Sequence, residues 1–153
     1  NQLAERFRTT LFRQAMFAEF EAETYRLSWS GTPLTKDLLC SLYHELNSEY
    51  YGEETVIDED IDHEWERIPH FYMQFYVYQY ATGFSAAMAI ARRILSGDEK
   101  TKEGYFRFLK GGCSKTPVEL LKLVGLDMEK PDVVNEAMKV FEGLIKELEG
   151  SFS

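Results

Sequence analysis

The sequence predicts an all-α protein built as an irregular bundle of several helices. Apolar residues recur three and four positions apart through most of the chain, which is the spacing of amphipathic helices. Neither an Asn-Gly hairpin signal nor a sustained apolar/polar alternation is present, so strands are not expected. With 153 residues, of which 44% are hydrophobic, the chain can bury a core and represents one domain or a piece of a larger one.

Two long helices and a short one are predicted for the first half of the chain. The cluster Ser28–Pro33 separates the long helices, with Thr32 as the N-cap of the second one and Pro33 as its first residue. Gly52 ends this helix, because glycine readily adopts the left-handed conformation that follows a helix. The first helix begins at Leu3, the second extends from Leu34 to about Tyr51 after this Thr-Pro start, and the third begins near Asp58 within an acidic run that starts at Glu53.

Four further helices are predicted for the second half. Pro69 interrupts the chain before a long helical stretch that ends ahead of Gly97. Thr116 and Glu119 have the spacing of a capping box around Pro117, which marks a helix start. The four helices comprise residues 71–96, 99–109, 117–124 and 131–150.

Composition excludes several classes of protein. The net charge is −9, from 17 Lys and Arg against 26 Asp and Glu, so binding to nucleic acid or to an anionic membrane surface is not expected. No apolar run is long enough to span a bilayer and no signal-peptide pattern is present, so we expect a cytoplasmic protein. Cys40 and Cys113 are expected to be reduced thiols. The chain opens inside a helical pattern without Met, which suggests a piece of a longer protein.

A metal site within this chain is not expected. His63 and Glu64 match the first half of the zinc-binding pattern H-E-x-x-H, but Arg67 stands where the second histidine belongs. His44 also lacks a histidine one turn later. We interpret the acidic residues in this part of the chain as a solvated surface.

Seven aromatic residues lie between Phe71 and Phe84, a density that is unusual for a core helix. At about 100° per residue, a helix here would carry aromatic rings over more than half of its circumference. Core helices use mostly Leu, Ile and Val, which have no hydroxyl group to satisfy. Two interpretations remain open: a buried aromatic helix whose hydroxyls bond to the main chain, or the wall of a cleft in which phenols donate to a carbonyl or an oxyanion. The small residues from Ala81 onward favour close packing of another helix.

Three blocks of sequence carry a resemblance to a known family. The first is FRTTLFRQAMFAEFE, residues 7–21; the second is IPHFY with FYVYQYATGFSA, residues 68–72 and 75–86; the third is FLKGGCS with PVELL, residues 108–114 and 117–121. Through these blocks the chain resembles, nearly from end to end, the C-terminal part of the oligoendopeptidase F group, in the thimet-oligopeptidase-like family of zinc metallopeptidases. A glycine is usual in that family where Cys113 stands.

The resemblance implies a mostly helical peptidase whose deep channel admits oligopeptides and excludes folded proteins. The zinc of this family is held by an H-E-x-x-H helix and by a glutamate on the next helix, both upstream of the region represented here. Residues 1–153 would then be the C-terminal helical segment of the catalytic domain, without its zinc site, and inactive in isolation. The implied partners are an oligopeptide substrate and the remainder of the catalytic domain, or self-association through exposed apolar surface.

The resemblance also implies roles for five residues of the aromatic segment. His70, Tyr76 and Tyr78 match the catalytic histidine and tyrosine pair, which bind substrate and stabilise the oxyanion. Tyr72 and Tyr80 would line the substrate site. A function of a different class stays open, namely a non-catalytic helical module whose aromatic groove binds a peptide or a partner helix.

Overall fold

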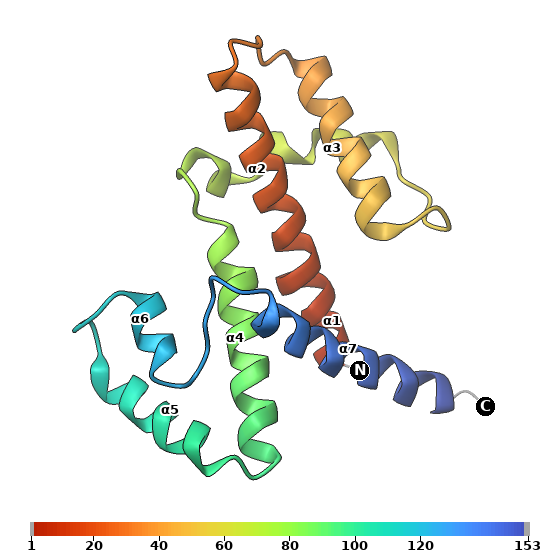
Figure 1. The fold of residues 1–153 in the computed structure, drawn as a ribbon. Coiled ribbons are helices and arrows are strands. Elements are labelled where there is room, and N and C mark those ends of the chain that lie inside the picture. Colours follow the sequence, from red (N-terminus) through yellow and green to blue (C-terminus); the bar gives the residue numbers. More distant parts are fainter. Residues whose placement is uncertain (1, 152–153) are drawn as a thin grey trace. The chain divides into compact units, whose positions relative to one another are not determined.

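The structure, a computed structural model, describes residues 2–151 and contains only helices and their connections there (Figure 1). The all-α prediction is confirmed. Two compact units make up the chain: residues 8–81 form one, and the residues up to Phe7 together with those from Thr82 onward form the other. Within the described residues, no helix is both long and apolar enough to cross a membrane.

The helical elements follow one another in the order of the chain. They are α1 (Gln2–Arg6), η1 (Phe7–Phe12), α2 (Arg13–Trp29), α3 (Lys36–Tyr51), η2 (Glu59–Arg67), η3 (Pro69–Tyr72), α4 (Tyr78–Leu95), α5 (Glu99–Gly111), α6 (Pro117–Lys122) and α7 (Asp132–Ser151). Elements η2 and η3 are 3₁₀-helices, whereas η1 is a π-helical segment that the apolar spacing did not indicate.

Several predicted helix boundaries are confirmed. Gly52 ends α3 with a φ of +78°. Asp58 is the N-cap of η2, and Thr116 and Glu119 form the capping box of α6. Helix α6 ends at Lys122, slightly earlier than predicted.

The predicted start of α3 is wrong, because Thr35 and not Thr32 is its N-cap. The side chain of Thr35 accepts the main-chain N–H of Leu38 at 3.3 Å. The hydroxyl of Thr32 instead lies 3.1 Å from the hydroxyl of Ser30, in the turn that ends α2. Both threonines satisfy the local pattern of an N-cap, so the sequence alone could not distinguish them.

The predicted helix over residues 71–96 is wrong in its first part. Residues 73–77 are not helical, and α4 begins only at Tyr78. The interruption has a physical cause at Phe75, whose φ of +51° lies in the left-handed region that a right-handed helix cannot contain. The aromatic side chains of this segment are therefore not distributed around a single continuous helix.

Residues 8–81 share one apolar core, in which α2 and α3 pack as an antiparallel pair (Figure 1). The ring of Phe20 on α2 meets that of Tyr43 on α3 edge-on, with centroids 5.1 Å apart. Phe20 also contacts Phe71 of η3 at 5.2 Å, so the short helix packs directly on α2. The buried residues of this core are Met16, Phe17, Phe20, Tyr43, Leu46, Ile68 and Val77.

A buried carboxylate, that of Glu64 on η2, joins three elements of this unit. It accepts the hydroxyl of Tyr43 on α3 at 2.8 Å and pairs with the guanidinium groups of Arg13 on α2 and Arg67 on η2. Burial, and then the bond to Glu64, raise the pKa of the Tyr43 phenol well above its usual value, so this phenol stays a donor at neutral pH. A buried acid is tolerated only with such partners, so the network fixes η2 against both long helices.

Replacing Glu64 by Leu should lower the free energy of unfolding of the chain by about 3 kcal/mol, because the buried Tyr43 hydroxyl and Arg13 lose their acceptor. Urea denaturation measures this loss. Glu66→Leu, an exposed position on the same short helix, is the control and should change stability by less than about 0.5 kcal/mol. Equal losses in the two variants would contradict the role of the network.

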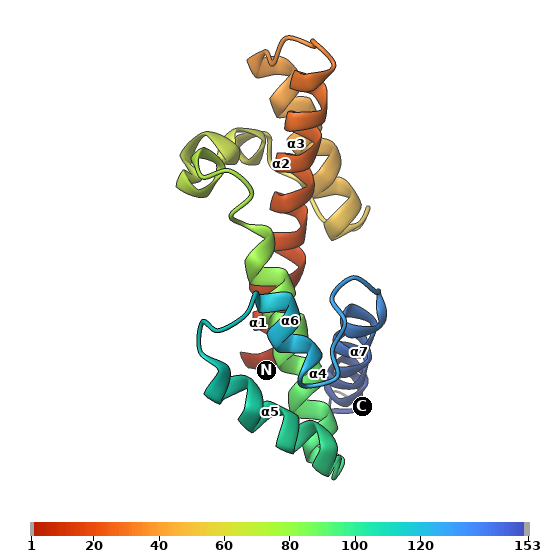
Figure 2. The same ribbon diagram turned by 60° about the vertical axis from the view of Figure 1, so that its left-hand side comes forward.

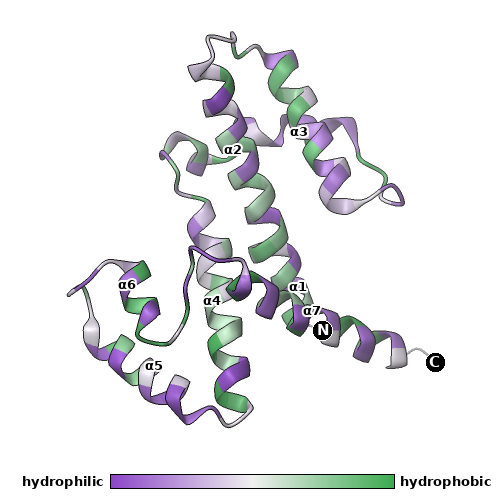
Figure 3. Ribbon diagram, viewed as in Figure 1, coloured by the Kyte–Doolittle hydropathy of each residue, from purple (hydrophilic) through white to green (hydrophobic). Residues whose placement is uncertain are grey.

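The second unit is arranged around α4, with α5 and α6 on one side and α7 on the other (Figures 1 and 2). Much of α4 is apolar (Figure 3), and its buried face meets the chain between α6 and α7. Arg93 of α4 donates to Glu136 of α7 at 3.0 Å and to the carbonyl oxygen of Gly125 at 3.2 Å. The core of this unit comprises Ala86, Ala89, Ile90, Val124, Leu126 and Val133.

Gly104 of α5 is buried against the end of α6. A Cβ atom there would stand 2.5 Å from the carbonyl oxygen of Leu123 and 3.0 Å from the Cα atom of Val124. Because both are backbone atoms, Gly104→Ala should destabilise the chain by about 1–3 kcal/mol, seen as a lower melting temperature. Gly143→Ala on α7 is the control: nothing lies within 4 Å of its Cβ, so alanine should stabilise by about 0.5–1 kcal/mol. A similar loss in both variants would argue against this close approach.

Candidate functional site

Three of the five predicted site residues form an aromatic cluster, His70, Tyr76 and Tyr80. The imidazole of His70 on η3 stacks on the ring of Tyr76, with centroids 5.2 Å apart and 3° between the planes. The ring of Tyr80, in the first turn of α4, stands nearly perpendicular to both, 5.8 Å from His70 and 5.7 Å from Tyr76. The cluster therefore places one imidazole and two phenols in a single patch.

The aromatic cluster is open to solvent. Tyr76 and Tyr80 are 37% and 38% exposed, and His70 is half-buried. The rings of Tyr76 and Tyr80 are therefore not sealed in the interior of this chain, as the interpretation of a buried aromatic helix requires. A hydrogen bond with the Tyr76 hydroxyl raises the pKa of the Tyr80 phenol above its usual value, so Tyr80 keeps its proton at neutral pH.

Tyr72 and Tyr78 are more exposed than the cluster. Tyr72 ends η3 and is 79% exposed, and Tyr78 begins α4 and is 50% exposed. The ring contacts of His70 instead involve Tyr80, for which the resemblance implied only a lining role. Tyr76 and Tyr80 are therefore the tyrosines whose rings contact that of His70.

A tight turn brings Tyr76 to His70. The main-chain N–H of Tyr76 donates to the carbonyl oxygen of Met73 at 3.2 Å, which closes a four-residue turn. Phe75 occupies the third position of this turn with a φ of +51°, a conformation that glycine or asparagine usually supplies. Holding a phenylalanine there costs about 1–2 kcal/mol, so the turn depends on contacts with its surroundings.

Glu21 of α2 provides one of these contacts. Its Oε1 atom accepts the main-chain N–H of Phe75 at 2.8 Å, and the residue is only 2% exposed. One helical turn further along α2, the ring of Tyr25 packs on the ring of Phe75 with centroids 4.7 Å apart. Burial raises the pKa of the Glu21 carboxyl above its usual value, and the bond from Phe75 offsets part of that shift.

Sequence reasoning missed Glu21, Tyr25 and Phe75. One signal was present, because Glu21 follows Phe20 directly and lies one turn after Phe17, on the buried face of the first helix where an acid is rare. The group that its carboxylate binds, the main-chain N–H of Phe75, could not be found in this way. Phe75 lies 54 residues away and has no side chain that favours a turn.

A second group of polar side chains lies between α3 and η2. The Sγ atom of Cys40 is 3.5 Å from Nδ1 of His63, and Nδ1 of His44 is 2.8 Å from Oδ1 of Asp62. These residues border an open hollow of about 640 Å³. Nowhere in residues 2–151 are three or more His, Cys, Asp or Glu side chains placed to hold a metal ion together. The described residues therefore offer no set of ligands that could hold a zinc ion.

Known proteins of similar sequence are peptidases. Residues 1–140 match the family described as Peptidase family M3. The chain is 47% identical over 149 residues to Oligopeptidase PepF of Bacillus subtilis, and 44% identical over 149 residues to the chromosomal Oligoendopeptidase F of Lactococcus lactis subsp. cremoris. Both matches cover 97% of this chain but only 22% and 25% of the relatives, so the chain spans about a quarter of their length.

Two solved structures have the same fold. The crystal structure of oligoendopeptidase-F from Enterococcus faecium superimposes with a TM-score of 0.95 at 44% identity, and covers 98% of this chain and 29% of its own. That of a putative peptidase from Chlamydophila abortus gives a TM-score of 0.91 at 42% identity, covering 97% of this chain and 25% of its own. The resemblance stated from the sequence is thereby confirmed.

Proposed function

This chain belongs to peptidase family M3, and we propose that residues 1–153 form the C-terminal helical segment of the catalytic domain of a zinc-dependent oligoendopeptidase. In the complete protein, this segment supplies side chains that bind the main chain of a short peptide and stabilise the transition state of its hydrolysis. The observation that carries the proposal is the solvent-facing cluster of His70, Tyr76 and Tyr80 in a chain of this family.

The chemistry of these side chains suits amide hydrolysis. The carbonyl oxygen of the scissile bond gains negative charge in the tetrahedral intermediate, and a fixed hydrogen-bond donor beside it lowers the barrier. We assign this work to His70, Tyr76 and Tyr78, with Tyr72 and Tyr80 lining the substrate site. A hydrogen bond between the hydroxyls of Tyr76 and Tyr80, which raises the pKa of Tyr80, would keep the two phenols together at the substrate site.

The zinc ion of such an enzyme would be held by the remainder of the polypeptide, since the described residues offer no suitable set of ligands. The 153-residue chain by itself should therefore not hydrolyse peptides. We also propose a cytoplasmic location, which the two free thiols, Cys40 and Cys113, support.

The alternative is a non-catalytic module whose aromatic cluster binds a peptide or a partner helix. The reading frame discriminates between the two functions. An H-E-x-x-H motif encoded ahead of residue 1 favours the peptidase, whereas a start codon directly ahead of it favours the module.

In the complete protein, one of the two phenols, that of Tyr76 or that of Tyr78, is the oxyanion donor. Replacing this tyrosine by phenylalanine should lower kcat on the order of 10²–10³-fold, because the hydrogen bond to the oxyanion is made in the transition state. KM should change little for the same reason. The measurement is hydrolysis of an internally quenched oligopeptide.

Tyr50→Phe is the matched control for these variants. It removes a hydroxyl of the same unit that donates to Glu19 at 2.8 Å, and kcat should stay at the wild-type value. If kcat is unchanged in both Tyr76→Phe and Tyr78→Phe, the catalytic role of the pair is wrong. Binding of the peptide without any hydrolysis by the wild-type protein would favour the module.

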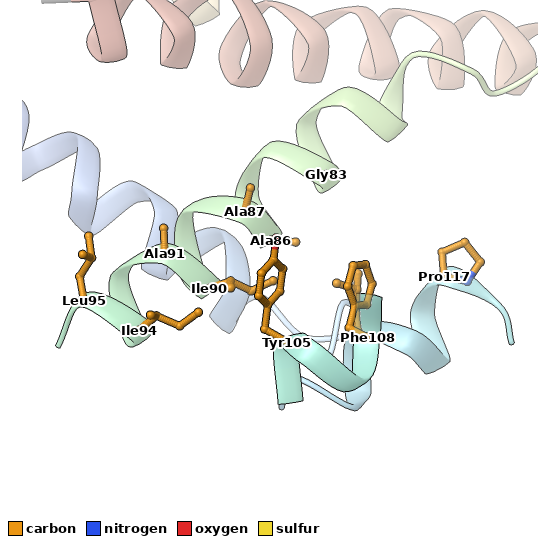
Figure 4. Close-up of a pocket in the computed structure, with 11 residues that line it drawn as sticks. Gly83, Ala86, Ala87, Ile90, Ala91, Ile94, Leu95, Tyr105, Phe108 and Pro117 are labelled. Atoms are coloured by element: carbon orange, nitrogen blue, oxygen red, sulfur yellow. The ribbon is translucent and has the colours of Figure 1, made fainter. Parts of the chain in front are cut away.

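A large apolar hollow in the second unit supports packing against the rest of a longer polypeptide. It has a volume of about 640 Å³ and lies between α4, α5 and α6 (Figure 4). Gly83, Ala87 and Ala91 are exposed on α4 at a spacing of four, so another helix could approach that surface closely. The relatives, of which this chain covers 22% and 25%, have ample further chain to provide such a helix. The other lining residues are Ala86, Ile90, Ile94, Leu95, Tyr105, Phe108, Pro117 and Leu121.

Without this partner, the 153-residue chain should self-associate through the apolar hollow, because exposed apolar patches of this kind favour association. Ala87→Lys places a charge in the hollow and should shift the chain toward monomer in size-exclusion chromatography with light scattering. Asn135→Lys, an exposed position of α7 outside the hollow, adds the same charge and should leave the association unchanged. A monodisperse wild-type monomer would contradict the proposed packing surface.

A further inference from the structure

We infer that Glu21 is a positioning residue of this active site: its buried carboxylate holds the turn at Phe75 and thereby sets the place of Tyr76. The inference rests on the proposed function, in which Tyr76 contacts the substrate. Glu21 acts through the main chain of residue 75, and the catalytic side chains remain those named above.

The turn needs an acceptor from outside itself. Its own hydrogen bond extends from the N–H of Tyr76 to the carbonyl oxygen of Met73, which leaves the N–H of Phe75 unused within the turn. Oε1 of Glu21 accepts this N–H at 2.8 Å. Because Glu21 is almost completely buried, the bond is shielded from competing water.

Two further contacts hold the residues on either side of Tyr76. Tyr25 lies one turn after Glu21 on α2, and its ring packs on that of Phe75. Val77 is fully buried in the core of the same unit. The main chain of Tyr76 is therefore anchored on both sides, while its ring stays exposed beside His70.

A carboxylate would be an unfavourable choice if Glu21 served packing alone. Removing an acid from water costs free energy unless hydrogen bonds compensate, and burial raises the pKa of Glu21 accordingly. A leucine would fill similar space without this penalty, but it offers no acceptor to the amide of Phe75. The acceptor is thus the property that an apolar residue cannot replace.

Kinetics of the complete peptidase test this role. A displacement of about 1 Å at a catalytic group can lower the rate on the order of a hundredfold, so Glu21→Leu should lower kcat roughly tenfold to a hundredfold. Because the substrate contacts themselves remain, KM should stay within about threefold of the wild-type value. Glu21→Gln keeps a carbonyl oxygen for the amide and should retain kcat within about threefold.

Glu23→Leu is the matched control, since Glu23 lies on the same helix but pairs with Arg26 at the surface. Its kcat should equal the wild-type value. If Glu21→Leu does not fold, Glu21→Met replaces it with the same expected losses, because methionine also lacks a strong acceptor. Equal loss of kcat in Glu21→Gln and in the apolar variant would overturn the inference.

A double-mutant cycle separates positioning from a general loss of structure. If Glu21 acts through Tyr76, then Glu21→Leu should lower kcat far less in a Tyr76→Phe background than in the wild type. If the two substitutions lower kcat by independent factors, so that the double variant shows their product, the inference is overturned, because Glu21 then acts through some other group.

Hydrogen exchange at the amide of Phe75 gives a readout that does not depend on catalysis. The amide should exchange roughly tenfold faster or more in Glu21→Leu than in the wild type, and at a nearly normal rate in Glu21→Gln. Unchanged protection in Glu21→Leu would overturn the inference. If the wild-type protein hydrolyses no peptide, the proposed function fails, while this measurement still decides whether Glu21 holds the turn.

Discussion

The chain from the start of η2 to the start of α4 consists of two short 3₁₀-helices and a tight turn, so its main chain must be held in place by side chains of the neighbouring helices. Two buried acids do this. Glu64 ties the beginning of the segment to α2 and α3, and Glu21 accepts the N–H of Phe75 further along. His70 lies between these two anchor points in the sequence. An irregular segment can therefore present an imidazole and phenols in a defined arrangement, although it has little regular secondary structure of its own.

The helical framework was largely predictable, because its signals act within one or two turns of the chain. The capping box at Thr116 and the glycine at position 52 are local features, and both are confirmed. The start of α3 shows the limit of such signals. Thr32 and Thr35 have the same capping chemistry, but Thr35 accepts the N–H of Leu38, whereas the hydroxyl of Thr32 lies beside that of Ser30. Local propensity leaves that choice open, and only the folded turn decides it.

The arrangement of the candidate site depends on long-range contacts, so sequence patterns could not give it. Helical spacing predicted one continuous helix from residue 71 onward, but a carboxylate 54 residues away accepts the amide of Phe75 and supports its left-handed conformation. The density of aromatic residues marked the segment that holds the five candidate residues, and the family resemblance supplied their individual roles. Which of them meet is a property of the turn: Tyr80 contacts His70 because residues 73–77 reverse the chain before α4 begins.

The surroundings of each phenol, more than its residue type, separate structural tyrosines from candidate functional ones. Tyr43 is fully buried and its hydroxyl proton is already donated to Glu64, so its phenol serves the core. Tyr76 combines an exposed ring with a main chain anchored on both sides. A hydrogen-bond donor that stabilises a developing charge must be in place before the reaction. The entropy lost in ordering a mobile loop would otherwise offset the stabilisation of the transition state. A left-handed Phe75 and a desolvated acid are each unfavourable alone, and such local strain persists where the surrounding structure holds it. Here both features are found at the turn that carries Tyr76.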